Sequence, residues 1–190
     1  AIDHPGLVLP QAVSQGENAS AGKKLAGEND ASIPAASLTS LNIVSRYCEA
    51  LSLSQLILRR GRVPAETVLN IARQLLESLA VLHERGLVHG DVSLSNALLA
   101  RNGQVVLVDC GVRPAVQPEF QISAAETPER YDGIAPELIG TGRSLSVASD
   151  LYALGCLLWH LLAGRSAFPT GDPLARLAAH QTERVPDIRE

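Results

Sequence analysis

The chain has 190 residues, a formal net charge of −4, 46% hydrophobic residues and 19% charged residues. These values are those of a folded globular protein, and they exclude a disordered tail or a collagen-like chain. The weakly acidic balance, without a basic cluster, predicts no nucleic-acid partner. The longest apolar run, residues 151–163, contains His160 and is too short and too polar to span a membrane, so no membrane segment is predicted in this chain.

The first part of the chain predicts two strands separated by a long loop. A short apolar run at 6–9 and a β-branched stretch at 41–47 are typical of strands. Residues 13–38 are rich in Gly, Ser, Ala and Asn, which predicts a flexible loop. Residues 53–60 then predict a short helix that ends at Gly61.

A stronger helix is predicted from Pro64 to Gly86. Proline is favoured in the first turn of a helix, and Glu66 in that turn complements the helix dipole. Apolar residues recur at helical spacing on one face, which is expected to be core: Val68, Ile71, Ala72, Leu75, Leu79 and Leu82.

The middle of the chain predicts short strands around polar loops. Residues 87–88, 97–100 and 105–109 are expected to be strands, with the Asn-Gly pair at 102–103 as a hairpin turn. Residues 110–143 show little periodicity and predict a long loop, of a kind that is usually functional.

Two further helices are predicted near the C-terminal end. Residues 145–163 are apolar nearly all round, which indicates a buried helix, and Gly164 is expected to cap it. Residues 173–180 predict a last short helix.

The cysteines, Cys48, Cys110 and Cys156, are widely spaced and form no C-x-x-C pair. This pattern favours neither a disulfide framework nor a zinc site, so we expect packing residues in a reducing, cytoplasmic environment. Methionine is absent, and we therefore interpret the chain as processed or as part of a longer one.

Three polar residues flank the predicted hairpin. Asp91 and Asn96 precede the strand at 97–100, and Asp109 ends the strand at 105–109, so the fold is expected to bring them together. Carboxylate and amide oxygens suit a magnesium ion that also holds phosphate oxygens. A carboxylate kept off the metal could accept a proton from an attacking hydroxyl, which favours phosphoryl transfer.

The sequence resembles the protein kinase superfamily, in particular the bacterial eukaryotic-like serine/threonine kinases. The segments that carry the resemblance are His89-Gly90-Asp91 with Asn96 for H-R-D-x-x-x-x-N, Asp109-Cys110-Gly111 for D-F-G, Ala135-Pro136-Glu137 for A-P-E, residues 149–168 for the central large-lobe helix, and residues 43–57 for the last small-lobe strand and hinge. Nearly the whole chain is covered, apart from 13–38.

The resemblance implies an α+β, protein-kinase-like fold. A mainly helical large lobe would carry a small β-hairpin layer and a remnant of the β small lobe. Residues 1–48 would be the small-lobe remnant, with a flexible insertion at about 13–38. Residues 49–190 would be the large lobe, truncated before its last helices.

The resemblance also implies roles for single residues. Asp91 would be the catalytic base, and Asn96 and Asp109 would hold Mg²⁺ for ATP. Asp150 would brace the backbone of the catalytic loop, and His89 would be structural. The expected adenine-side contacts are the gatekeeper Ser45, the hinge residues Tyr47 and Cys48, and Leu98 beneath the ring.

Several family features are absent or changed. There is no glycine-rich loop, and the only lysines, Lys23 and Lys24, lie in a polar stretch where neither could pair with phosphate. Gly90 replaces the usual arginine, Ser93 stands where these kinases place a lysine, and Cys110 replaces a phenylalanine.

The resemblance therefore predicts a protein serine/threonine kinase that is weakly active or inactive in this form. Its partners would be ATP and a protein substrate, and the exposed surface facing the small lobe could favour self-association. One alternative is a pseudokinase or scaffold that binds partners without catalysis. Another is a small-molecule phosphotransferase, against which the A-P-E match and the 149–168 helix argue.

Overall fold

The computed structural model describes residues 2–17, 39–112, 131–168 and 172–189. The chain divides into a hairpin unit, Pro10–Arg46, and a main unit formed by Ala1–Leu9 and Tyr47–Glu190. No helix in the described part is both long and apolar enough to cross a membrane.

The hairpin unit contains the first two strands. β1 (Pro10–Glu17) pairs antiparallel with β2 (Thr39–Ser45), with Val13 opposite Ile43 and Glu17 opposite Thr39. The predicted loop over 13–38 is therefore wrong at its start, because a partner strand distant in sequence supplies ladder hydrogen bonds that local composition does not reveal. Residues 18–38 of that prediction lie outside the described residues.

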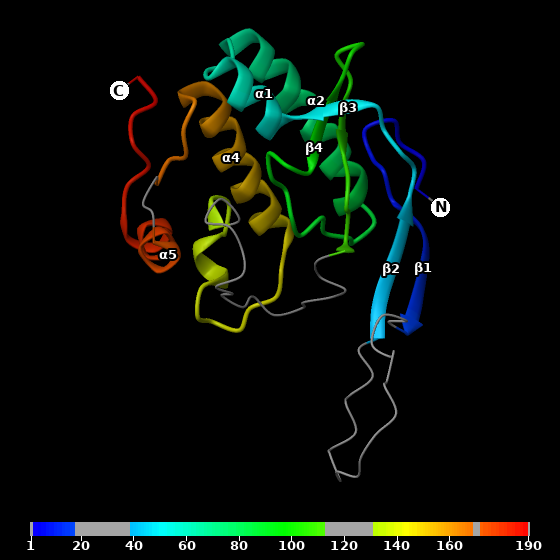
Figure 1. The fold of residues 1–190 in the computed structure, drawn as a ribbon. Helices are drawn as coiled ribbons and strands as arrows, with labels where there is room; N and C mark the ends of the chain where they lie inside the picture. The colour runs from blue at the N-terminus through cyan, green and yellow to red at the C-terminus, as the bar shows by residue number, and fades with distance from the viewer. Residues whose placement is uncertain (1, 18–38, 113–130, 169–171, 190) are drawn as a thin grey trace, which may run out of the picture. The chain divides into compact units, whose positions relative to one another are not determined.

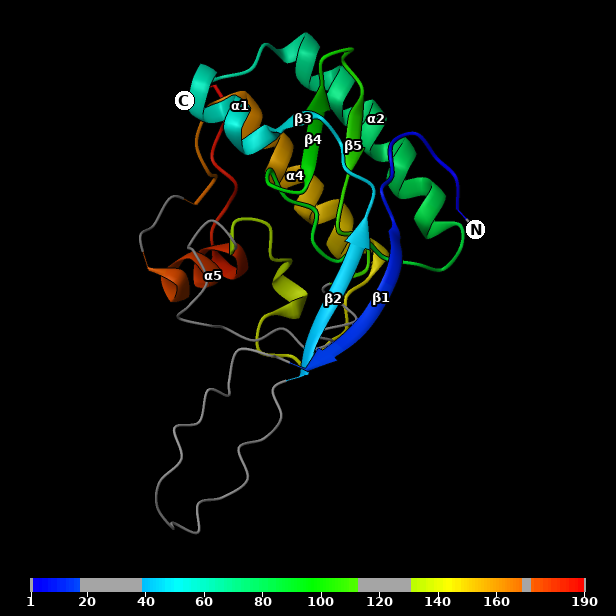
Figure 2. The same ribbon diagram turned by 45° about the vertical axis from the view of Figure 1, so that its right-hand side comes forward.

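The main unit has a three-stranded antiparallel sheet. Its order is β3 (Ala50–Ser52), β4 (Ala97–Ala100) and β5 (Val105–Leu107), as Figure 2 shows. The predicted strand at 6–9 is reduced to one parallel bridge, in which the Val8 N–H donates to Leu107 O at 2.9 Å. Residues 87–88 are not a strand, and the three-residue β3 was not predicted.

Helices outnumber strands among the regular elements described in the main unit (Figure 1). They are α1 (Leu53–Arg60), α2 (Ala65–His83), the 3₁₀ turn η2 (Pro136–Leu138), α4 (Val147–Ala163) and α5 (Pro173–Thr182). Ser52 and Ser146 cap α1 and α4 through capping boxes, and Gly164 ends α4 at φ 75°. The predicted helices are thus confirmed to within a few residues at their ends.

The main core lies between α2, α4 and the sheet. The face of α2 predicted to be core is buried in the structure, with Leu75 at 0% and Leu79 at 1% exposure. Leu154, Leu157 and Leu161 of α4 pack into the same cluster. Each such leucine contributes roughly 1.5–3 kcal/mol to the stability of the fold when it is fully buried. The packing of these two helices therefore fixes the ends of the loops between them.

Candidate active site

The β4–β5 hairpin places the predicted metal residues at one end of the sheet. Ala97 pairs with Leu107, and the Val108 N–H donates to Asn96 O at 3.0 Å. Asn96 and Asp109 therefore flank the same end of the hairpin. The Asn96 Nδ2 donates to Asp91 O at 3.0 Å, which ties the loop carrying Asp91 to that end.

Asp109 has an unusual backbone conformation. Its φ is 59°, and it is the only non-glycine residue with a positive φ in the described part of the chain. Aspartate tolerates this left-handed region better than most residues. Its side chain is exposed. The following Gly111 N–H donates to His89 O at 3.0 Å, which joins this turn to the Asp91 loop.

His89 is a structural residue in this loop. Its Nδ1 accepts from the Asp91 N–H at 3.2 Å, so its Nε2 carries the proton and donates to Val108 O at 3.1 Å. Burial lowers the pKa of His89 below its usual value, against the opposing charge of Asp150 and other carboxylates. The imidazole therefore stays neutral and links the Asp91 loop to the end of β5.

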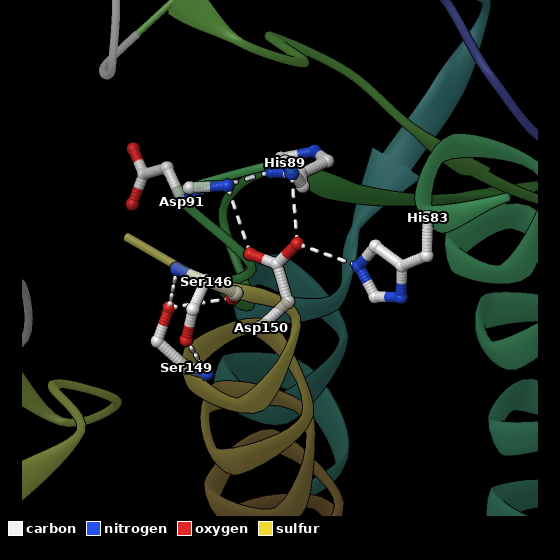
Figure 3. A network of polar contacts seen from close by, with 7 residues as sticks. His83, His89, Asp91, Ser146, Ser149 and Asp150 are labelled. Carbon is white, nitrogen blue, oxygen red and sulfur yellow. Dashed lines mark hydrogen bonds and ion pairs between the residues drawn. The ribbon is translucent and has the colours of Figure 1, made fainter. Parts of the chain in front are cut away.

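Asp150 holds the loop from below, as Figure 3 shows. Its Oδ2 accepts from the His89 N–H at 2.8 Å and from His83 Nε2 at 2.9 Å, and its Oδ1 accepts from the Gly90 N–H at 2.8 Å. The Asp91 carboxylate points away from this network. The predicted bracing role of Asp150 is confirmed, and its carboxylate is 2% exposed.

Sequence reasoning missed His83 as part of this brace. Its place in the last turn of α2 is typical of a residue that simply complements the helix dipole. Because 67 residues separate it from Asp150, no local pattern could reveal the pairing.

Ser93 hydrogen-bonds within its loop, and Cys110 is packed in the core. The Asn96 N–H lies 3.3 Å from Ser93 Oγ, which accepts from it, and no lysine occurs among the described residues. Cys110 is 6% exposed, and burial raises the pKa of its thiol to about 12. A thiol this hard to ionise is inert, as predicted for a packing cysteine.

The residues predicted to contact adenine are spread over both units. Ser45 belongs to the hairpin unit, whereas Tyr47, Cys48 and Leu98 belong to the main unit. Tyr47 is 87% exposed, and Cys48 is half-buried. Leu99 packs against the core, so alternation along β4 turns Leu98 to the other face of the sheet. Their contacts with a nucleotide stay predictions.

A pocket of about 480 Å³ opens beside Asp91. Its walls come from the Asp91 loop, α1, α4 and the segment at 132–138. Many of the side chains that line it are apolar, including Ile57, Leu138 and Leu157. A hydroxyl-bearing segment could therefore enter here and bring its oxygen to the Asp91 carboxylate.

The family model of the protein kinase domain matches residues 35–190. This chain belongs to the protein kinase family. The predicted superfamily is thereby confirmed, and the α+β fold agrees with it.

Curated relatives share about a third of their aligned residues with this kinase chain. A serine/threonine-protein kinase (drp72) of Corynebacterium efficiens is 33% identical over 149 residues, which is 77% of this chain and 28% of the relative. PknL of Mycobacterium tuberculosis is 33% identical over 136 residues, 72% of this chain and 34% of the relative. The chain thus spans about a third of the length of these relatives.

The donors at the end of the hairpin fit a magnesium ion. The described side-chain contact of Asn96 uses its Nδ2, so Oδ1 is the atom that would face a cation, together with the Asp109 carboxylate. Oxygen donors of this kind are those that Mg²⁺ prefers, and it commonly completes its shell with water and phosphate oxygens. The described part of the chain holds no group of three or more His, Cys, Asp or Glu placed to bind a metal.

Proposed function

We propose that this chain carries the phosphoryl-transfer site of a protein serine/threonine kinase, with ATP as donor and a protein hydroxyl as acceptor. The observation that supports it most is the joint placement of Asp91, Asn96 and Asp109 at one end of the β4–β5 hairpin, backed by the buried Asp150 brace. The names of the relatives agree with this chemistry.

Each residue would have a distinct role. Asn96 and Asp109 would hold Mg²⁺, which neutralises charge on the ATP phosphates. The Asp91 carboxylate, which points away from Asp150, would accept the proton of the acceptor hydroxyl as that oxygen attacks the γ-phosphorus. His89 and Asp150 would keep the Asp91 loop in place and touch neither substrate. On the nucleotide side, Ser45, Tyr47, Cys48 and Leu98 would contact adenine.

Transfer by this chain should be slow. The described residues include no lysine, and the Ser93 hydroxyl is engaged with the loop backbone. Transition-state charge would then depend mainly on the metal, and phosphate-binding donors are usually the largest source of catalysis. The same two observations favour the second candidate function, a pseudokinase that binds nucleotide or protein without turnover.

The test is transfer of labelled γ-phosphate from ATP to a pooled library of short peptides, each with one central threonine. We expect slow, magnesium-dependent labelling that falls by about 10²-fold or more in Asp91→Asn. The control is Asp187→Asn, which removes an exposed carboxylate paired with Arg189. Labelling that Asp91→Asn leaves unchanged would contradict the proposal, and no labelling with retained Mg-ATP binding would support the pseudokinase.

A further inference from the structure

The segment at 131–138 forms one wall of the Asp91 pocket and packs against α5. Asp132, Gly133 and Ile134 line the pocket. Tyr131 is 0% exposed, and it belongs to the same apolar cluster as Leu177 of α5. The wall therefore depends on a helix that does not itself line the pocket.

One carboxylate oxygen gives this attachment a buried ion pair. Asp132 Oδ1 accepts from the Ser166 hydroxyl at 2.9 Å and forms an ion pair with the Arg176 guanidinium. The side chains of Arg176 and Asp132 are only 8% and 18% exposed. Three residues from distant parts of the sequence thus meet at this oxygen, and one of them, Asp132, belongs to the pocket wall.

Arg176 contacts the pocket wall through Asp132. Within the described residues, Asp132 lines the pocket and Arg176 does not. Removing one partner of a buried ion pair leaves the other charge uncompensated. Without Arg176, the Asp132 carboxylate would lose the cation that holds it, and because Asp132 lines the pocket, the wall would change shape there.

We infer that Arg176 is a positioning residue for the phosphoryl acceptor, because through Asp132 it fixes the wall against which the acceptor segment lies. That the pocket receives an acceptor rests on the proposed function, whereas the attachment of the wall rests on the contacts above. Reacting atoms must be placed to within about 1 Å for efficient transfer, so a displaced wall would weaken acceptor binding and leave nucleotide binding intact.

Hydrogen exchange tests the attachment of the segment at 131–138 to α5 without an activity assay. In Arg176→Ala, amides at 131–138 should exchange at least about tenfold faster, because local opening becomes easier. Amides at 89–97, on the Asp91 loop, should keep their wild-type rates. The matched control is Arg73→Ala, which breaks an exposed ion pair with Glu77 on α2 and should change neither segment.

The kinetic readout uses the same peptide library. In Arg176→Ala, the apparent KM for the peptides should rise about tenfold, while the KM for Mg-ATP stays within about twofold of wild type. Arg176→Lys keeps the charge but not the guanidinium geometry, so its apparent KM for the peptides should rise less than that of Arg176→Ala. An absence of transfer by the wild-type chain would count against the proposed function, and the exchange rates would still decide the role of Arg176.

Two results would overturn the positioning role. One is wild-type exchange at 131–138 in Arg176→Ala. The other is an equal rise in exchange at 131–138, at 89–97 and in α2, which would mean that Arg176 only adds global stability. If Arg176→Ala does not fold, Arg176→Lys and Asp132→Asn decide by the same comparison, because both keep hydrogen-bonding groups at this site.

Discussion

Asp150 shows how one buried carboxylate can define a loop. It accepts hydrogen bonds from two backbone N–H groups and from His83 while it is 2% exposed. Hydrogen bonds to a charged group are worth roughly 1.5–3 kcal/mol each, and their loss leaves buried donors without a partner. The position of the Asp91 loop therefore depends on a buried residue in the first turn of α4.

We predict that Asp150→Ala lowers the free energy of unfolding by about 3 kcal/mol or more, as expected when one partner of a buried charged network is removed. Urea denaturation followed by circular dichroism measures it. The matched control, Asp187→Asn, removes an exposed carboxylate and should cost less than about 0.5 kcal/mol. Equal effects of the two substitutions would show that the brace is not needed for stability.

At the scale of single residues, the spacing of the candidate site residues is visible in the sequence, whereas two of their supports are not. Asp91, Asn96 and Asp109 follow a known spacing; the β4–β5 register places Asn96 and Asp109 at one end of the hairpin, and Asn96 Nδ2 ties the Asp91 loop to it. His83 and Arg176 each pair with a residue far away in sequence. No periodicity or motif encodes such pairs, because they form only when helices from different parts of the chain pack together.

At the scale of elements, α4 carries the brace into the core. Asp150 lies in its first turn, directly after a capping box formed by Ser146 and Ser149. The Ser149 N–H donates to Ser146 Oγ at 3.2 Å, and the Ser146 N–H donates to Ser149 Oγ at 2.8 Å. Fraying of this turn would loosen the carboxylate that holds the Asp91 loop.

Ser146→Ala should therefore lower the free energy of unfolding by about 1 kcal/mol, the usual cost of a lost N-cap. Thermal denaturation measures the change. Ser144→Ala, an exposed serine two residues earlier, serves as the control and should be nearly neutral. A neutral Ser146→Ala would mean that packing of α4, and not its cap, fixes the first turn.

The helices were predictable because their signals are local. Apolar spacing marks α2 and α4, Pro64 precedes α2, and Gly61 and Gly164 end α1 and α4. The strands were harder, because β3 has three residues and β1 pairs with a segment more than twenty residues away. Strand formation depends on a partner, which a single stretch of sequence does not contain.

At the scale of the whole molecule, buried histidines make stability depend on pH. Burial lowers the pKa of His180 to about 4, and it lowers the pKa of His89 as well. The His180 Nδ1 lies 2.7 Å from the Tyr152 hydroxyl, so the neutral ring is the form that fits as acceptor. Below pH 6.5 the unfolded chain binds protons that the folded chain does not.

We therefore predict that the contribution of His180 to the free energy of unfolding is fully present above about pH 6.5. It should be lost progressively between pH 6.5 and about 4. The contribution of one group is at most about 1.4 kcal/mol per pH unit. Urea midpoints measured across this range should fall less steeply in His180→Asn, which keeps an acceptor but does not titrate. Parallel pH profiles for the variant and wild type would contradict this assignment.

The central claim is that the end of the β4–β5 hairpin holds Mg-ATP, and thermal denaturation with and without the ligand tests it directly. Ligand at about 100 times its Kd stabilises the folded chain by roughly 2.7 kcal/mol. We predict a rise in Tm with Mg-ATP that disappears when EDTA replaces magnesium and is lost in Asp109→Asn, since asparagine keeps the backbone conformation at φ 59° but not the charge. An equal rise in Asp109→Asn, or no rise at millimolar Mg-ATP in wild type, would contradict the account.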